Sequence, residues 1–517
     1  MRTLALAMSA LAVMAHGAQP KTDPVTGEAA DKKAAPAPAG APAAAPAAPP
    51  EKAAPKAAPV KLDPQLLDQA LNDYFTGHPR DAAPKLYLWL DNTAPTDDNY
   101  AWAEYFLARS LIDLDLRHAG AWYLAKIARE RTNPNVLPKA LGALQSLTDL
   151  PHDEAMIDEQ VFGALDLGFL PDDIAGYAHY QQGLVDLKVG NERWANTHFT
   201  KLPEGSVEVS RAKYALLVNR LKTLKKDVPK DVIDDFFTLA QDQKLTLEAR
   251  NDAMLAVARL KYELKDWNGA LEAYAKVQLP PLDPGRATLY LEEAWTRYQL
   301  GQIHAAMGIL TTLDAPSFRD EFLPDKYLLR ALIYRDLCHY LPAKRAAKEL
   351  TRRFADSLEA IREREDLTQD ARLLRAAGSH GSTRRAKRFL DAIDLEAETL
   401  GRYAGAFGDR LFSHVTRIYD LAHAEAGRLY QLRLAESVRA EADVLLRAAE
   451  QVRLMEYEVG LKLYERVKKG SKLTPLVEEP PLGPKQVSFA FKDEYWNDEL
   501  RDYRFSLASR CLEEGAP

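Results

Sequence analysis

The residues that could carry catalytic chemistry are few, and their spacing suits none of the common reaction sites. The stretch AGSHGSTRR, at 377–385, has two glycines and a hydroxyl-rich turn, but it lacks the Lys-Ser/Thr pair of a phosphate-binding loop, so we interpret it as a flexible connection. His414 and His423 are nine residues apart, too far for two metal ligands one turn apart on a helix, and we expect partly exposed surface histidines. The sequence contains no GxSxG or HExxH motif. We therefore assign no catalytic, cofactor-binding or metal-binding residue.

A basic cluster, STRRAKRFL, occupies 382–390. Its simplest interpretation is the solvated start of a helix. The alternative is a site for an anionic envelope polymer or for the acidic tail of a partner protein.

Cys338 and Cys511 are the only two cysteines. They could pair in an oxidising compartment and close a large loop. We favour two unpaired thiols, because a helical chain of this length has core enough without a covalent link.

The composition is that of a globular helical protein with an exported N-terminus. The 517 residues are 47% hydrophobic and 28% charged, and the net charge of -7 argues against nucleic-acid binding. At the N-terminus, Arg2 precedes a short apolar run and then small residues, the layout of a cleavable signal peptide over 1–18. The run is about half of the roughly 20 residues that a membrane-spanning helix needs, so a membrane anchor is the weaker interpretation, and we expect no transmembrane segment in the mature chain. Residues 19–60 are almost all Ala, Pro and Lys, which predicts a disordered, semi-extended tether.

Helical periodicity begins near residue 61 and continues to the C-terminal region, which predicts an all-α fold. Within it, pairs of small residues recur at a spacing of twelve, with larger residues four and seven positions further on. The sets are Ala258, Ala270, Tyr274 and Val277; Ala294, Ala306, Leu310 and Leu313; Ala331, Ala343, Ala347 and Leu350; and Gly183, Ala195, Phe199 and Leu202. Residues 99–130 look like a degenerate unit with Ala108 and Gly120, 66–90 like a capping helix pair, and 211–240 fit poorly.

This pattern resembles the tetratricopeptide repeat, although most of that family's Trp and Pro positions are missing here. The resemblance implies a helical-repeat solenoid over 61–358 that acts by binding other proteins on the surface of its successive first helices. The partner-binding candidates that it implies there are Tyr177, Tyr180, Arg259, Tyr262, Trp295, Tyr298 and Arg335.

No proline occurs between Pro342 and Pro475, which predicts long helices over 359–474, with a break near 401–408. Along 438–466, nine residues alternate at spacings of four and three, and seven of them are apolar: Val438, Ala442, Leu445, Ala449, Val452, Glu456, Val459, Leu463 and Arg466, with Glu456 and Arg466 as the two exceptions. We call this set the 438–466 seam. An intramolecular antiparallel hairpin is the favoured interpretation, because the alanines suit close packing, and self-association as a coiled coil is the alternative.

The C-terminal segment, 475–517, is rich in aromatic residues, which predicts that it packs on the body or docks a partner. Its text EYWNDELRDYRF resembles a Tyr-Trp-x-Asp-Glu-Leu-x-x-Tyr motif in tails of the tetratricopeptide envelope proteins of myxobacterial adventurous gliding motility. The matching residues are Tyr495, Trp496, Asp498, Glu499, Leu500 and Tyr503. The resemblance implies a non-enzymatic scaffold of a motility complex, either periplasmic or associated with the outer membrane, with Tyr495 and Trp496 as further partner-binding candidates. The alternative is an adaptor for cell-wall or secretion-system assembly, and an enzyme with an unrecognised site is the least favoured class.

Overall fold

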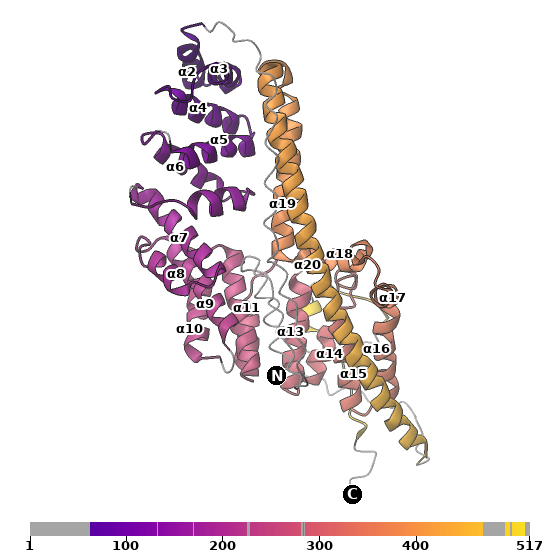
Figure 1. Cartoon of the computed structure of the whole chain (residues 1–517). Helices are drawn as coiled ribbons and strands as arrows, with labels where there is room; N and C mark the ends of the chain where they lie inside the picture. Colours follow the sequence, from indigo (N-terminus) through magenta and orange to yellow (C-terminus); the bar gives the residue numbers. More distant parts are fainter. Residues whose placement is uncertain are drawn as a thin grey trace, which may run out of the picture.

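The computed structural model of the protein describes residues 63–131, 133–168, 170–224, 228–280, 283, 285–468, 487, 492–496 and 499–511. The predicted signal peptide and tether lie outside these residues. Every regular element in the described residues is a helix, which confirms the all-α prediction. Figure 1 shows the helices stacked in a column from α2 to α11 and continuing through α13–α16, with the long helix α20 running diagonally across the molecule.

Six helix pairs make up most of the column. They are α2 (Leu66–Phe75) and α3 (Pro79–Asn92), α4 (Tyr100–Asp113) and α5 (Arg117–Glu130), α7 (Asp172–Lys188) and α8 (Glu192–Phe199), α11 (Leu247–Glu263) and α12 (Trp267–Tyr274), α13 (Gly285–Gln299) and α14 (Ile303–Thr312), and α15 (Pro324–Asp336) and α16 (Tyr340–Arg353). Helix α6 (Leu137–Leu147) and a π-helical segment, η1 (Ala155–Phe162), separate the second pair from the third. Helices α9 (Val207–Thr223) and α10 (Lys230–Gln241) follow the third pair and have a longer connection, in the region whose sequence fits the repeat poorly.

Each of the six pairs is joined by a three-residue turn whose middle residue is left-handed. These middle residues are Gly77, Asp115, Gly190, Lys265, Gly301 and Cys338, with φ between 60° and 85°. The amide of the third turn residue then bonds back to the carbonyl five residues earlier, as His339 N does to Tyr334 O at 2.8 Å. This is the Schellman arrangement, which ends one helix and aims the chain back along it. The recurring turn gives the repeat a common geometry that its varied sequences do not display.

The small residues predicted to lie between paired helices are buried. Ala258 and Ala270 are fully inaccessible, as are Ala294 with Ala306 and Ala331 with Ala343. At Gly183 a Cβ atom would lie 2.2 Å from the ring of Phe199, so only glycine fits there. The register assigned from the sequence is therefore the register of close helix contact.

Ala270→Leu and Ala306→Leu should each lower the free energy of unfolding by about 1–3 kcal/mol, because three added carbon atoms have no room between the paired helices. The matched control is Ala424→Leu, at an exposed position on α20 (Ala404–Lys468). Thermal and chemical unfolding compare the three variants with the wild type. Equal unfolding midpoints for Ala270→Leu and Ala424→Leu would show that the helices paired at Ala270 are not in tight contact.

Past the last pair come α17 (Ala355–Glu363), the short 3-10 turn η2 (Leu367–Gln369), α18 (Ala371–Ser379), α19 (Gly381–Gly401) and the 65-residue α20. The break between α19 and α20 falls at 402–403, and Gly408, inside α20, has non-helical angles, so the predicted break is confirmed. The stretch at 377–385, expected to be a flexible connection, instead ends α18 and begins α19, with only His380 between them. His380 bonds to Glu441 of α20 at 2.5 Å, which fixes the junction.

Helix α20 ties the two ends of the column together. Its first half lies against α19 and contributes Phe407, Leu411 and Val415 to the core formed by α2–α7. Its second half packs on α15, α16 and α18. At a rise of 1.5 Å per residue, 65 residues span about 98 Å, and Figure 1 shows α20 running from the level of α2 and α3 to below α15.

The 438–466 seam does not have the environment that the sequence suggested. Val438 and Ala442 pack with Leu373 and Ala377 of α18, and Leu445, Val452 and Val459 pack with α15 and α16. The hairpin exists, but α19 pairs with the earlier half of α20. Self-association through the 438–466 seam was therefore the wrong alternative, because the chain's own last repeat covers the apolar residues of this seam.

Candidate protein-interaction surface

Of the two tyrosines predicted on α7, Tyr177 belongs to the core and Tyr180 is half-buried. Tyr177 is 5% exposed, and its hydroxyl donates to Asp158 at 2.7 Å and accepts from the amide of Gln181 at 2.8 Å. Burial raises the pKa of Tyr177 far above its ordinary value. The prediction that Tyr177 contacts a partner was therefore wrong. Tyr180 is half-buried near Phe199, and burial raises its pKa to about 12.

Arg259 links two successive repeats instead of projecting from them. Its guanidinium binds the carboxylate of Glu292, on α13, with Nη2 2.8 Å from Oε1 and Nε 3.1 Å from Oε2. The arginine side chain is 14% exposed, so the two-pronged pair is shielded from water and positions α13 against α11. Tyr262, one turn further along α11, lies edge-on to Trp267 with ring centroids 4.9 Å apart.

The candidates on α13 and α15 continue this line of contacts. Trp295 and Tyr298 are in edge-to-face contact, and the hydroxyl of Tyr298 donates to Asp336 of α15. Burial raises the pKa of Tyr298, and the hydrogen bond to Asp336 adds to the shift. Arg335 pairs with its neighbour Asp336 at 2.8 Å and with Glu458 of α20 at 3.2 Å.

The structure thus places Arg259, Tyr298 and Arg335 where the repeat pattern put them, on successive first helices. It assigns them, however, to contacts between neighbouring elements: α11 to α13, α13 to α15, and α15 to α20. Because the guanidinium groups of Arg259 and Arg335 and the hydroxyl of Tyr298 already have partners within the chain, a binding protein would have to compete with those contacts.

The C-terminal tail lies along α14 and across the turn between α15 and α16. Phe505 N donates to His304 O at 2.9 Å, and Arg510 N donates to Leu337 O at 3.0 Å. Thr312 donates from its hydroxyl to Leu500 O, and Leu500 is buried among residues of α13–α15. The tail backbone passes so close to α14 that a Cβ at Gly308 would lie 1.8 Å from Tyr503 O. Of the two possibilities that the aromatic composition left open, the described residues of the tail pack on the body.

A disulfide joins Cys511 at the end of this tail to Cys338, the left-handed residue of the last repeat turn. The preference for two free thiols was therefore wrong. Chain length and composition indicate whether a core needs a covalent link, but they do not show that the tail returns to the turn that holds Cys338, 173 residues earlier in the sequence.

The two aromatic candidates of the tail, Tyr495 and Trp496, differ in exposure. Tyr495 is half-buried against the α13–α15 cluster, and burial raises its pKa to about 12. Trp496 is 45% exposed, and its amide donates to the hydroxyl of Tyr503 at 2.8 Å. Asp498 lies outside the described residues. Trp496 is therefore the member of the motif that presents a large apolar surface while its backbone is held in place.

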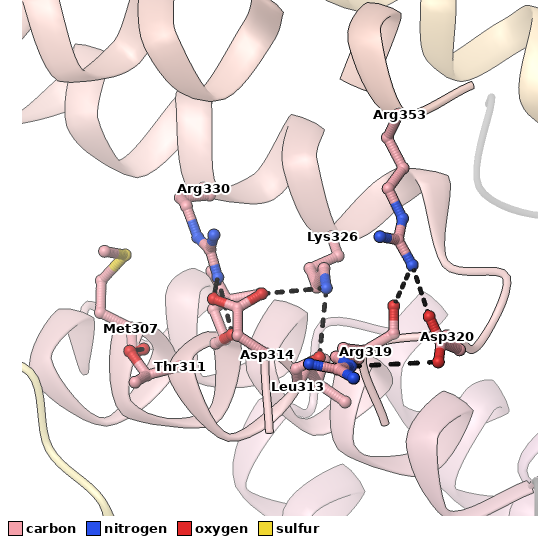
Figure 2. Close-up of polar contacts among 10 residues, drawn as sticks. Met307, Thr311, Leu313, Asp314, Arg319, Asp320, Lys326, Arg330 and Arg353 are labelled. Atoms are coloured by element: carbon pink, nitrogen blue, oxygen red, sulfur yellow. Dashed lines mark hydrogen bonds and ion pairs between the residues drawn. The ribbon is translucent and has the colours of Figure 1, made fainter. Parts of the chain in front are cut away.

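A buried ionic cluster fixes the loop between α14 and α15, beside the tail. Figure 2 shows Lys326 and Arg330, both on α15, converging on Asp314. Lys326 Nζ lies 3.0 Å from Asp314 Oδ1 and 3.1 Å from Leu313 O, and Arg330 Nη2 lies 2.5 Å from Asp314 Oδ2. Burial lowers the pKa of Lys326, and the carboxylate of Asp314 opposes that shift. The cluster is a structural link, because its charges and carbonyls satisfy one another.

Two arginines of the basic cluster and one of the two histidines considered as metal ligands form ion pairs within the chain. In the basic cluster at 382–390, Arg384 pairs with Glu248 at 2.8 Å and Arg385 with Glu154 at 3.6 Å, which connects α19 to the column. The structure therefore gives no support to the anionic-polymer alternative. His414 is half-buried among aromatic rings, whereas His423 is exposed and pairs with Asp394 at 3.2 Å.

A small cavity of about 40 Å³, with mostly apolar walls, lies between α5, the loop before η1, and α19. Its wall includes Glu396, which accepts from His118 N and from the hydroxyl of Tyr419, each at 2.7 Å. Burial lowers the pKa of His118 to about 4. The space is on the scale of one or two water molecules. Among the described residues there is no cluster of metal ligands, and none of their helices is long and apolar enough to cross a bilayer.

Sequence reasoning missed one exposed feature. The last part of α20 presents Leu454, Tyr457, Leu461, Tyr464 and Val467 to solvent, and the first four of these lie on the side away from the 438–466 seam. We call this set the α20 stripe. A second apolar periodicity, at spacings of three and four, was present in the sequence but was hidden behind the stronger seam. No family model and no curated protein sequence matches the chain.

Proposed function

We propose that this protein is an exported, non-enzymatic scaffold for protein–protein interactions in the bacterial cell envelope. The observation that carries the proposal is the disulfide between Cys338 and Cys511, which closes the tail onto a column of helix pairs. Such bonds form and persist in oxidising compartments such as the periplasm. The signal-like N-terminus, read from the sequence, points to the same compartment.

The scaffold role is supported by how the chain uses its charged and aromatic groups. Arg259, Tyr298 and Arg335 lock successive helices together, and α20 braces both ends of the column. A stack of helix pairs held in this way offers an extended, preorganised surface, which is how repeat proteins bind other proteins.

We further propose that the complex served is a gliding-motility complex. This step is supported by the tail motif that begins at Tyr495, which resembles the motility family, and by the position of Trp496, half-exposed on a tail that is covalently secured. An adaptor for cell-wall or secretion-system assembly is the second candidate, since the same column and the same compartment would serve it.

Trp496→Ala should weaken partner binding by about 2 kcal/mol or more, because exposed tryptophans on preorganised surfaces carry an outsized share of binding energy. The isolated protein should melt almost as the wild type does. The matched control is Trp194→Ala, since Trp194 is also exposed, at 62%, but lies on α8 away from the tail. Affinity capture from envelope extracts, quantified by mass spectrometry, compares the three proteins.

Loss of motility subunits from the Trp496→Ala capture alone would support the first candidate function. Loss of cell-wall synthases or secretion components would support the second. Identical captures by all three proteins would remove Trp496 from the interaction surface.

A further inference from the structure

The α20 stripe is an apolar surface on a helix that is already packed on its opposite side. Leu454, Tyr457, Tyr464 and Val467 are each more than 60% exposed, and Leu461 is 47% exposed. On the other side of the same helical turns, Val452 and Val459 are 1% exposed against α15 and α16. A helix with apolar residues on two opposite sides is built to pack on both. Only one of those sides is covered by the described residues.

The spacing of the stripe indicates what fits it. Leu454, Tyr457, Leu461 and Tyr464 alternate at three and four residues, the arrangement with which one helix packs lengthwise on another. We propose that the partner is a second copy of this chain, with the two stripes packed antiparallel around a two-fold axis near residue 459. The inference is independent of the proposed envelope function.

Side-chain size favours the antiparallel orientation. With the axis near residue 459, Leu454 faces Tyr464 of the second copy, and Tyr457 faces Leu461 of the second copy. These four stripe residues of each copy then form four facing pairs, each of one leucine and one tyrosine, which fills the space between the helices evenly. A parallel pair would alternate layers of two tyrosines with layers of two leucines.

The charges along the end of α20 favour the same orientation. Glu456 and Arg466 belong to the 438–466 seam, and Arg466 lies over the ring of Tyr340 on α16, so neither charge faces away from the column. With the axis near residue 459, antiparallel packing places Glu450 beside Lys468 of the second copy and Arg453 beside Glu465 of the second copy. Parallel packing would instead place each of these charges beside the same charge of the second copy.

The overall shape leaves room for this pairing. Figure 1 shows the last turns of α20 running past α15, away from the rest of the column. An overlap of residues 450–468 engages only these helix ends, so the two columns extend in opposite directions. Both copies use the same surface, and the two-fold symmetry closes the assembly at a dimer. The overlap is short, so the interface belongs to the small size class and the dimer should be reversible.

Sedimentation velocity of the full chain over a concentration series tests the proposal. The wild type should shift from monomer to dimer as its concentration rises. The double variant Tyr457→Lys with Leu461→Lys should remain monomeric throughout, with an unchanged melting temperature. The matched control is Leu421→Lys, since Leu421 is 64% exposed on α20 but outside the stripe, and it should dimerise as the wild type does.

Cysteine cross-linking tests the orientation. Chains with Leu454→Cys, mixed with chains with Tyr464→Cys under mild oxidation, should form a disulfide between unlike copies. Leu454→Cys alone should not form a dimer through that cysteine, and if it did, the antiparallel register would be wrong.

A wild type that stays monomeric at every concentration would overturn the proposal. Two further readouts on such a monomer identify what covers the stripe instead. Binding to anionic phospholipid vesicles that is lost in the double variant would assign the stripe to a membrane surface. Resistance of Leu454→Cys to thiol labelling would assign it to the chain's own residues after 468.

Discussion

Asp314→Ala should lower the free energy of unfolding by about 2–4 kcal/mol. The substitution leaves the ammonium of Lys326 and the guanidinium of Arg330 without their anion, in a site where those side chains are 4% and 13% exposed. Removing one partner of a buried ion pair is costly because the remaining charges stay desolvated. We place the effect below the full range for buried pairs, because the Asp314 side chain is itself 34% exposed.

The control for Asp314→Ala lies in the same loop. Asp320 pairs with Arg353 at 2.9 Å, but both side chains are more than a third exposed, so Asp320→Ala should cost about 0–1 kcal/mol. The difference in unfolding free energy between Asp314→Ala and the wild type should also become smaller as the pH rises towards 10.5. Burial already holds the pKa of Lys326 below that ordinary value, so the unfolded state binds more protons than the folded state in this window. Denaturant unfolding at several pH values measures both effects, and equal deficits for the two variants would contradict the cluster's role.

Gly308→Ala should lower the free energy of unfolding by about 2–4 kcal/mol, although alanine is the better helix former. The added methyl group would lie 1.8 Å from Tyr503 O and 2.9 Å from Arg504 Cα, and backbone atoms cannot yield as a flexible side chain does. The tail must therefore lift from α14. It would lose the burial of Leu500, worth about 1.5–3 kcal/mol, and the bond between Phe505 N and His304 O, worth about 1 kcal/mol.

Gly378→Ala is the matched control for this substitution. Gly378 also lies in a helix, α18, but a Cβ there would meet nothing within 4 Å, so the variant should be stabilised by up to about 1 kcal/mol. Hydrogen exchange across 499–511 should speed up in Gly308→Ala and stay unchanged in Gly378→Ala. A stabilised Gly308→Ala protein with a protected tail would show that the tail does not lie on α14.

The fold could be predicted from the sequence to the extent that it depends on local spacing. Small residues twelve apart, such as Ala258 with Ala270, mark helix pairs because close helix contact requires them, and glycine near 401–408 marks the break before α20. The turn geometry was less visible. Gly190 and Gly301 suit a left-handed residue, but Asp115, Lys265 and Cys338 occupy the same position without an obvious signal.

The functional surface was harder to predict, because it depends on which distant segments meet. The sequence could not show that Glu292 would pair with Arg259, or that Asp158 would hold the hydroxyl of Tyr177 inside the core. Cys338 and Cys511 are joined only because the tail follows α14 back to the last repeat turn. The 438–466 seam of α20 was visible in the sequence, but its partners on α15, α16 and α18 were not, and the second apolar face of the helix, the α20 stripe, was missed.

The central claim is that the chain acts outside the cytoplasm as a covalently closed helical scaffold. Intact-mass analysis of the protein from the periplasmic and membrane fractions, with and without thiol alkylation before reduction, tests this claim most directly. We expect a mature N-terminus between about residues 16 and 19 and no thiol available for alkylation until a reductant is added. A chain that retains Met1, fractionates with the cytoplasm and alkylates at both Cys338 and Cys511 without reduction would contradict it.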